Sequence, residues 1–156
     1  IKDFLFSDYS QSSVPVIDKD IFWNQHLNSK SEWQYSKYKY PQKYEDIIRK
    51  LDQYCHDKNI DLKIILFPHH IDDIKVLRKY NLLDEKIKFY QFLSQLSAKV
   101  INFDYDHELI YNKNNFSDPV HCNNKIGKII INEIFTEEYE LGILNSDQRF
   151  SNIKYR

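Results

Sequence analysis

Two short runs of almost uninterrupted apolar residues constrain the fold of this chain more than any other feature of its sequence. Residues 62–67 read Leu-Lys-Ile-Ile-Leu-Phe, and residues 99–104 read Lys-Val-Ile-Asn-Phe-Asp. Runs of this length and composition are typical of β-strands buried on both faces, as in parallel sheets that are covered by helices. Pro68 directly follows the first run and marks the end of that strand.

Amphipathic helices are predicted on either side of these two strands. Apolar residues recur at intervals of three and four over residues 41–58, 71–80, 84–97 and 124–135. Pro41 suits the first turn of a helix, and Asn59 suits the position just after the end of one. The order helix, strand, helix, helix, strand, loop, helix predicts an α/β fold with a parallel sheet and flanking helices on both faces.

The rest of the chain lacks such a pattern. Residues 1–40 are rich in aromatic residues but have no clean period, and we expect an irregular segment with short structured pieces. Residues 41–135 form the predicted α/β core, and residues 136–156 are predicted to be a peripheral C-terminal extension. A length of 156 residues suits a single domain.

Composition excludes several classes of function. The 22 Lys and Arg residues balance 23 Asp and Glu residues, whereas a dedicated nucleic-acid binder would carry a basic excess. No apolar run approaches the roughly 20 residues that a membrane-spanning helix needs. The only two glycines, Gly127 and Gly142, cannot form a nucleotide-binding loop, and we expect no cofactor. Cys55 and Cys122 lack a metal-binding spacing; two unpaired thiols are the favoured interpretation, and a single bridge remains an alternative.

The most informative segment is 116–124, which reads Phe-Ser-Asp-Pro-Val-His-Cys-Asn-Asn. Asp118 and His121 are separated by two residues, and the fixed φ of Pro119 limits how the loop turns, so both side chains can lie on one side of it. There the carboxylate can orient the imidazole as in a catalytic triad. The N-terminus of the following helix disfavours the imidazolium and Asp118 favours it, which suits a general base. Spacing alone leaves open that Asp118 only caps a turn and His121 fills a loop.

Two more histidines, His69 and His70, follow the first strand directly. Ligands of open α/β sheets bind beyond the carboxyl ends of the strands, so we expect these residues to border the same cleft as His121 and to contact substrate there. A solvated turn is the alternative. A metal site is not favoured, because adjacent histidines do not have a usual chelating spacing. Its potential ligands would be His69, His70, His107, His121, Asp104 and Asp106.

An Asp-Pro-x-His motif followed by Asn and an amphipathic helix resembles the last motif of the SGNH/GDSL hydrolase superfamily. The resemblance covers residues 42–135 and implies a flavodoxin-like α/β fold in which His121 is the general base for a serine nucleophile and Asp118 completes the triad. The phrase Phe-Ser-Asp-Pro-Val-His is most similar to the branch linked to acyl transfer onto cell-surface polymers. The resemblance therefore implies ester hydrolysis or O-acyl transfer on a carbohydrate or acylated polymer, in the periplasm or cell envelope; the residues alone leave a cytoplasmic location open.

The chain departs from this family at its nucleophile. It has no Gly-Asp-Ser motif and none of the family's glycine-containing oxyanion motifs. The early serines lack the small neighbours that a strained nucleophile turn needs. They are Ser7, Ser10, Ser12 and Ser13. We therefore expect the chain to be the C-terminal portion of a longer enzyme, with the serine supplied upstream of Ile1.

A second hypothesis belongs to another class of function. The chain would be a non-catalytic carbohydrate-binding or interaction domain that keeps the α/β fold. The tryptophans and tyrosines of residues 21–40 would then serve as stacking surfaces, because aromatic rings combine a large apolar face with a polar edge.

Overall fold

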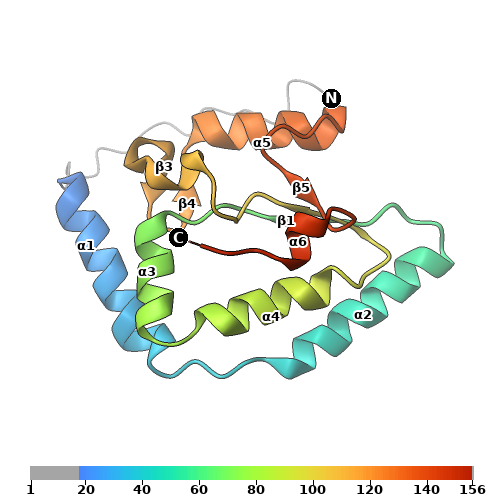
Figure 1. The fold of residues 1–156 in the computed structure, drawn as a ribbon, viewed down its shortest axis with the longest axis horizontal. Helices are drawn as coiled ribbons and strands as arrows, with labels where there is room; N and C mark the ends of the chain where they lie inside the picture. The colour runs from blue at the N-terminus through green and yellow to red at the C-terminus, as the bar shows by residue number, and fades with distance from the viewer. Residues whose placement is uncertain (1–17, 156) are drawn as a thin grey trace, which may run out of the picture.

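A computed structural model describes residues 18–155 as a mixed α/β domain (Figure 1). In chain order the elements are α1 (Lys19–Lys30), the π-helical turn η2 (Ser31–Tyr35), α2 (Gln42–Asp57), β1 (Lys63–Leu66), α3 (Ile71–Lys79), α4 (Leu83–Leu93), β2 (Lys99–Asn102), the 3₁₀ turns η3 (Glu108–Tyr111) and η4 (Lys113–Asn115), β3 (Phe116–Asp118), β4 (His121–Cys122), α5 (Asn124–Thr136), β5 (Ile143–Leu144) and α6 (Gln148–Ser151). The four predicted helices and both predicted strands are confirmed. Asn59 follows α2 with a positive φ of 53°, as expected for a residue that ends a helix.

One predicted helix ends earlier than its apolar pattern suggested. α4 ends at Leu93, although the pattern continued to residue 97. The chain turns here because the carboxylate of Asp52 on α2 accepts the backbone N–H groups of Ser97 (2.9 Å) and Ala98 (2.7 Å). A contact between distant parts of the chain thus decides where the helix stops.

The main sheet has three strands in the order β1-β2-β5. β1 and β2 are parallel as predicted, but β5 runs antiparallel to β2, so the sheet is mixed. The reversal follows from a buried side chain of α5. Glu133 accepts the backbone N–H groups of Leu141 (3.0 Å) and Gly142 (2.9 Å), and thereby holds the chain against β2 directly after the helix.

Helices cover both faces of this sheet, with α4 on one side and α5 on the other (Figure 1). Successive residues of β2 point to opposite faces, as in any strand. Val100 belongs to the larger hydrophobic cluster on the α4 side, whereas Ile101 packs with Ile126 and Ile130 of α5. The predicted burial on both faces is therefore confirmed for this strand.

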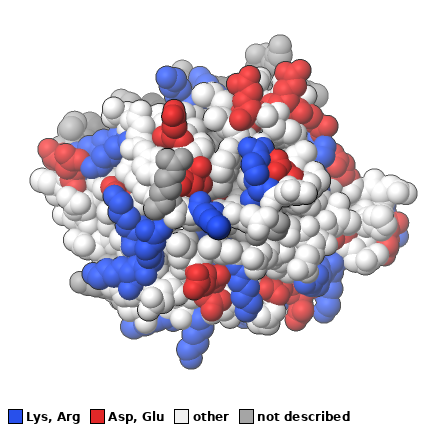
Figure 2. All heavy atoms as spheres, in the orientation of Figure 1, with Lys and Arg blue, Asp and Glu red and all other residues white. Residues whose placement is uncertain are grey.

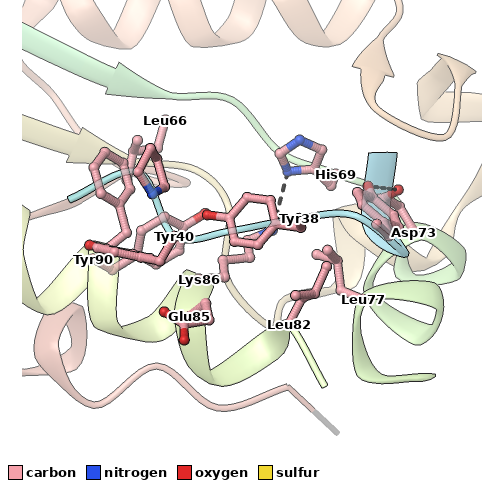
Figure 3. Close-up of a pocket in the computed structure, with 13 residues that line it drawn as sticks. Tyr38, Tyr40, Leu66, His69, Asp73, Leu77, Leu82, Glu85, Lys86 and Tyr90 are labelled. Atoms are coloured by element: carbon pink, nitrogen blue, oxygen red, sulfur yellow. Dashed lines mark hydrogen bonds between the residues drawn. The ribbon is translucent and has the colours of Figure 1, made fainter. Parts of the chain in front are cut away.

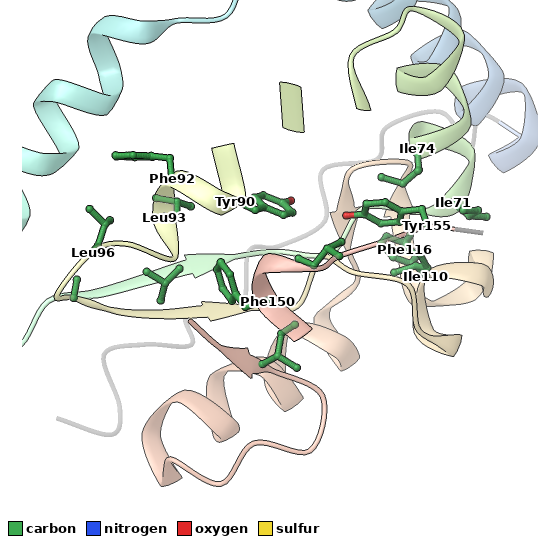
Figure 4. Close-up of a cluster of buried hydrophobic side chains, with 14 of the residues drawn as sticks. Ile71, Ile74, Tyr90, Phe92, Leu93, Leu96, Ile110, Phe116, Phe150 and Tyr155 are labelled. Atoms are coloured by element: carbon green, nitrogen blue, oxygen red, sulfur yellow. The ribbon is translucent and has the colours of Figure 1, made fainter. Parts of the chain in front are cut away.

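Segments outside the predicted core also contribute to it. Residues 136–156 were expected to be peripheral, but they add β5 to the sheet, and Phe150 and Tyr155 are buried in the larger cluster (Figure 4). Near the other end, α1 forms within the segment that was expected to be irregular and buries Trp23. The part of the predicted irregular segment that comprises residues 1–17 lies outside the described residues.

Helix α2 is amphipathic as predicted, yet much of its apolar surface faces solvent. Ile48 and Cys55 face the interior. Four other apolar side chains are about half exposed: Tyr44, Ile47, Leu51 and Tyr54. Polar anchors set this orientation, because Asp52 binds the turn after α4 and the guanidinium of Arg49 lies 4.7 Å from the ring of Phe92. The period predicted the helix but not the face that it buries.

Charges of both signs are interspersed over the face shown in Figure 2. One mixed cluster joins the starts of the two parallel strands, where the Glu137 carboxylate lies 2.7 Å from Lys63 and 2.8 Å from Lys99. Hydrogen bonds from these ammonium groups lower the pKa of Glu137 to about 2. None of the helices within residues 18–155 is long and apolar enough to cross a membrane.

Alanine substitutions at the two glycines should have opposite effects on the stability of the fold. A Cβ at Gly142 would lie 2.9 Å from a side-chain carbon of Ile101 and 3.0 Å from Phe103, so Gly142→Ala should lower the free energy of unfolding by about 1–3 kcal/mol. Nothing lies within 4 Å of a Cβ at Gly127 in α5, so Gly127→Ala should raise it by about 0.5–1 kcal/mol. Urea unfolding of both variants tests this, and a Gly142→Ala variant as stable as the parent would contradict the packing described.

Candidate functional site

The predicted pair Asp118 and His121 faces across the short β3–β4 hairpin, in which the two residues are register partners. The Asp118 Oδ2 atom lies 2.7 Å from His121 Nδ1. The other oxygen, Oδ1, accepts the backbone N–H groups of Val120 (2.9 Å) and His121 (3.0 Å). Asp118 therefore caps the turn and orients the imidazole at the same time. The turn cap and the contact with His121 are both present.

This geometry stabilises the ionised form of the Asp118 carboxylate. Burial alone would raise the pKa of Asp118, but hydrogen bonds from the Val120 amide and from His121 outweigh it and hold the pKa below its ordinary value. An ionised carboxylate accepts a hydrogen bond from His121 Nδ1–H, which leaves the Nε2 lone pair of the neutral ring available. Because the side chain of His121 is 71% exposed, a reactant can approach that nitrogen.

Another histidine, His26 of α1, approaches the second oxygen of this carboxylate. Its Nε2 atom lies 4.0 Å from Asp118 Oδ1, is buried, and has no hydrogen-bond partner among the described residues. When protonated, His26 places a positive charge beside the carboxylate that orients His121. No pattern in the sequence connects the two, because α1 and the hairpin are far apart along the chain.

A second histidine–aspartate pair lies where the two parallel strands end. His69 follows β1 and Asp104 follows β2, and the parallel register brings these ends together as predicted. The His69 Nδ1 atom lies 2.5 Å from Asp104 Oδ2, and the His69 backbone N–H donates to Oδ1 at 3.2 Å. The carboxylate of Asp104 is completely buried, whereas the His69 side chain is 33% exposed.

Helix α4 supplies the remaining partners of the Asp104 carboxylate. The Lys86 Nζ atom and the Tyr90 hydroxyl each lie 2.6 Å from Oδ2. Burial alone would raise the pKa of Asp104, but His69 and Lys86 outweigh it and hold this pKa well below the ordinary range. Lys86 and Tyr90 are four residues apart, so they lie on the same face of α4. Sequence reasoning identified the strand ends but missed Lys86 and Tyr90, for which this spacing is the available signal.

The second histidine of the predicted substrate-binding pair, His70, is buried at 4% exposure. Its Nδ1 accepts the backbone N–H of Asp72 at 3.1 Å and so caps α3, and its ring packs edge-on against Trp23 and Phe116. Burial lowers the pKa of His70. Its backbone N–H donates to the carbonyl of Pro119 at 2.8 Å. His70 thus holds the Asp118–His121 turn against the end of β1.

The remaining candidate ligands do not converge. Within residues 18–155, no three His, Cys, Asp or Glu side chains are grouped so that they could hold a metal ion. His107 is stacked on Tyr105 at 4.4 Å, and its Nε2 lies 3.0 Å from the carbonyl oxygen of Phe103. Cys55 and Cys122 are free thiols, as favoured from the sequence.

The early serines considered as nucleophiles lie outside the described residues. They are Ser7, Ser10, Ser12 and Ser13. Across residues 18–155, no serine hydroxyl is hydrogen-bonded to His121; the partner of its side chain is Asp118. The described residues therefore pair His121 with an orienting carboxylate, and none of their serine hydroxyls is bonded to that imidazole.

A cavity of about 380 Å³ lies between the segment 35–41 and helices α3 and α4 (Figure 3). Tyr35, Tyr38 and Tyr40, from the aromatic-rich segment, line one wall, and His69 belongs to another. The tyrosines that were expected to offer stacking surfaces thus surround a cavity, whereas Trp23 of the same segment is buried in the core.

Comparisons of the chain with protein-family models, with curated proteins and with solved structures find no match. Any assignment of activity therefore rests on the residues and their geometry. Two features carry it: the exposed His121 with its ionised partner, and the tyrosine-lined cavity beside His69.

Removing the buried charge of Asp104 should destabilise the fold strongly. Asp104→Asn leaves the Lys86 ammonium buried without its counter-ion, and we expect the free energy of unfolding to fall by about 3–5 kcal/mol. The double variant Asp104→Asn/Lys86→Met removes both charges and should recover part of this loss. Urea unfolding of Asp104→Asn, Lys86→Met and the double variant measures the coupling energy between the two side chains. Strictly additive losses of stability would contradict a direct ion pair.

Asp118 should make stability depend on pH in the acidic range. Its pKa is lower in the folded chain than in the unfolded chain, where it is about 3.9. The ionised carboxylate therefore favours folding fully above that value, and this contribution is lost as the pH falls through the folded-state pKa. Unfolding curves from pH 7 to pH 2 should show a difference between the parent and Asp118→Asn that is constant near neutrality and shrinks in acid. A difference that stays constant down to pH 2 would show that the carboxylate is not ionised preferentially in the folded chain.

Proposed function

We propose that this chain is part of an SGNH-type ester hydrolase or O-acyltransferase and supplies the His–Asp half of a Ser-His-Asp site. In this proposal His121 is the general base and Asp118 orients it. The substrate is an acylated carbohydrate or cell-surface polymer, and the protein acts outside the cytoplasm, in the periplasm or cell envelope. The serine and most of the oxyanion hole come from sequence upstream of Ile1.

The observation that carries this proposal is the 2.7 Å contact between His121 Nδ1 and Asp118 Oδ2. The carboxylate is held by two backbone N–H groups, so the imidazole is oriented by a rigid turn rather than by a flexible side chain. The accessible Nε2 is the atom that a triad histidine presents to its serine.

The surrounding architecture is consistent with the flavodoxin-like SGNH fold that we propose. β1 and β2 are parallel, α4 and α5 cover opposite faces of the sheet, and the motif lies immediately before α5. The Asn123 side chain caps that helix by accepting the backbone N–H of Ile126 at 3.0 Å. The start of the helix is thereby fixed next to His121.

The proposed reaction begins with the serine Oγ attacking the carbonyl carbon of the ester, while His121 Nε2 takes the hydroxyl proton. Asp118 stabilises the imidazolium that forms, because its carboxylate accepts the Nδ1–H. When the C–O bond of the ester breaks, the imidazolium donates its proton to the departing alkoxide, and the acyl group remains on the serine.

His121 then acts a second time as a base. It removes a proton from the acceptor, whose oxygen attacks the acyl-serine, and the released serine regains a proton from the imidazolium. If water is the acceptor, the product is a free acid. If a sugar hydroxyl is the acceptor, the product is a new ester. The chemistry at His121 is the same in both cases.

The test uses the protein with the polypeptide that precedes Ile1. We expect hydrolysis of an activated acetate ester and labelling by a serine-directed phosphonate. His121→Ala should lower turnover by about 10³-fold or more, because triad members act as a unit, and Asp118→Asn should cost at most as much. The 156-residue chain alone should show little of either activity.

His56→Ala is the matched control, because His56 is exposed on α2, away from the hairpin. It should leave turnover unchanged. Since His121 is also exposed, its replacement should shift the free energy of unfolding by no more than about 0.5 kcal/mol, so lost activity would not reflect lost folding. Full turnover in His121→Ala would overturn the proposal, and labelling of Ser7 in the short chain would place the nucleophile within this sequence.

A further inference from the structure

The tyrosine-lined cavity has properties that the proposed acyl-transfer chemistry does not use. Its wall combines the rings of Tyr35, Tyr38, Tyr40, Phe89 and Tyr90 with a small number of charged side chains (Figure 3). A concave, mainly apolar cavity with few polar groups is the usual form of a small-molecule site. The chemistry of those polar groups indicates which ligand it suits.

The tyrosine hydroxyl groups are largely occupied by the protein itself. Three tyrosines of the wall donate their hydroxyl to a buried carboxylate: Tyr35 to Asp73, Tyr40 to Glu45, and Tyr90 to Asp104. A phenol that donates to a carboxylate is not available to a hydroxylated ligand, and its ring becomes more electron-rich. What these residues offer the cavity is therefore the negative face of the ring, which attracts cations.

Two of these rings already attract a cation of the protein, because Lys86 Nζ lies 5.8 Å from the ring centroid of Tyr90 and Lys88 is close to Tyr40. The ammonium of Lys88 lies 4.1 Å from the ring centroid of Tyr40, well within the range of a cation–π contact. Glu85 lies near a further ring of the wall, because burial and, after it, the charge of that carboxylate raise the pKa of Tyr38.

The charged side chains of the wall leave a net negative balance. Lys86 is paired with Asp104 at 2.6 Å, so its positive charge is compensated by a group behind the wall. Asp73 and Glu85 then remain as the other charges of the lining. The Glu85 Oε2 atom is buried and has no hydrogen-bond partner within residues 18–155. A carboxylate that donors do not neutralise keeps its negative charge beside the cavity, and this charge favours a cation there.

We propose that this cavity binds an organic ammonium cation, with Glu85 as its counter-ion and the electron-rich tyrosine rings as its cage. A quaternary ammonium group suits the site because its methyl groups contact apolar walls while its charge interacts with ring faces and carboxylate. An anion would meet Asp73 and Glu85, and a sugar would find most of the tyrosine hydroxyl groups engaged. The inference does not depend on the acyl-transfer proposal, because it uses neither Asp118 nor His121.

The experiment titrates the full 156-residue chain with choline by isothermal calorimetry, at constant ionic strength. The comparison ligand is 3,3-dimethylbutan-1-ol, which has the shape of choline but carries no charge. We expect saturable one-to-one binding of choline, at least about tenfold tighter than binding of the neutral isostere. Equal affinities would show a purely apolar cavity and would overturn the proposal, as would the absence of saturable choline binding.

Variants locate the site. Glu85→Gln keeps the shape of the side chain and removes its charge, so choline affinity should fall about tenfold while binding of the isostere is unchanged. Glu140→Gln makes the same chemical change at an exposed position outside the cavity and should have no effect. Tyr38→Leu should weaken choline binding, and Tyr38→Phe should retain it, because the ring face is the contact.

Three further outcomes decide the matter. Unchanged choline affinity in Glu85→Gln would overturn the role of that carboxylate. Tighter binding of glucose than of choline would replace the cation with a neutral hydroxylated ligand. His121→Ala should leave choline binding intact, so a failure of the acyl-transfer proposal would be distinguishable from a failure of this one.

Discussion

The buried carboxylate of Asp104 is the interaction on which the rest of the structure depends. A charge removed from water is costly unless hydrogen bonds and an opposite charge compensate it. Here the donors come from the turn after β1 and from α4, through His69, Lys86 and Tyr90. Tyr155, near the other end of the described chain, donates to the backbone carbonyl of the same residue at 2.7 Å. One side chain and its carbonyl thus join two strands, a helix and the C-terminal segment.

The two histidine–aspartate pairs show how the same two residue types serve different ends. Around Asp104 the carboxylate is fully buried and has several donors, so His69 is one part of a structural network beside the cavity. Around Asp118 the carboxylate sits in a tight turn, and His121 extends into solvent with one nitrogen unengaged. The second arrangement leaves a base accessible to a reactant, which is why the proposed chemistry is placed there.

Local patterns predicted what depends on local contacts. Asp118 and His121 are three residues apart, and a single turn brings them together, so their contact could be inferred from spacing. The contact between His26 and Asp118 joins α1 to a distant hairpin, and nothing in either segment indicates it. The strand β5 has only two residues, Ile143 and Leu144, which is too short for a periodic signal.

Long-range polar contacts also explain the errors about burial. The apolar period predicted α2, but Asp52 and Arg49 determine which face of the helix is buried. Asp52 binds the turn that follows α4, and Arg49 contacts Phe92 on α4. Similarly, the segment after α5 lacks an obvious apolar period, and Glu133 brings it onto the sheet through two backbone N–H groups. Each of these three side chains is a single polar residue, and its effect depends on partners that come into reach only in the folded chain.

The contact of Tyr155 with Asp104 has a consequence for the way the chain matures during synthesis. β1, β2 and α4 leave the ribosome well before the segment that ends at Tyr155. Until that segment emerges, Asp104 and Lys86 lack part of the cover that Phe150 and Tyr155 give this side of the sheet. Without residues 150–155 water would therefore reach this ion pair, so the segment that follows β5 covers a charge that β2 and α4 have already positioned.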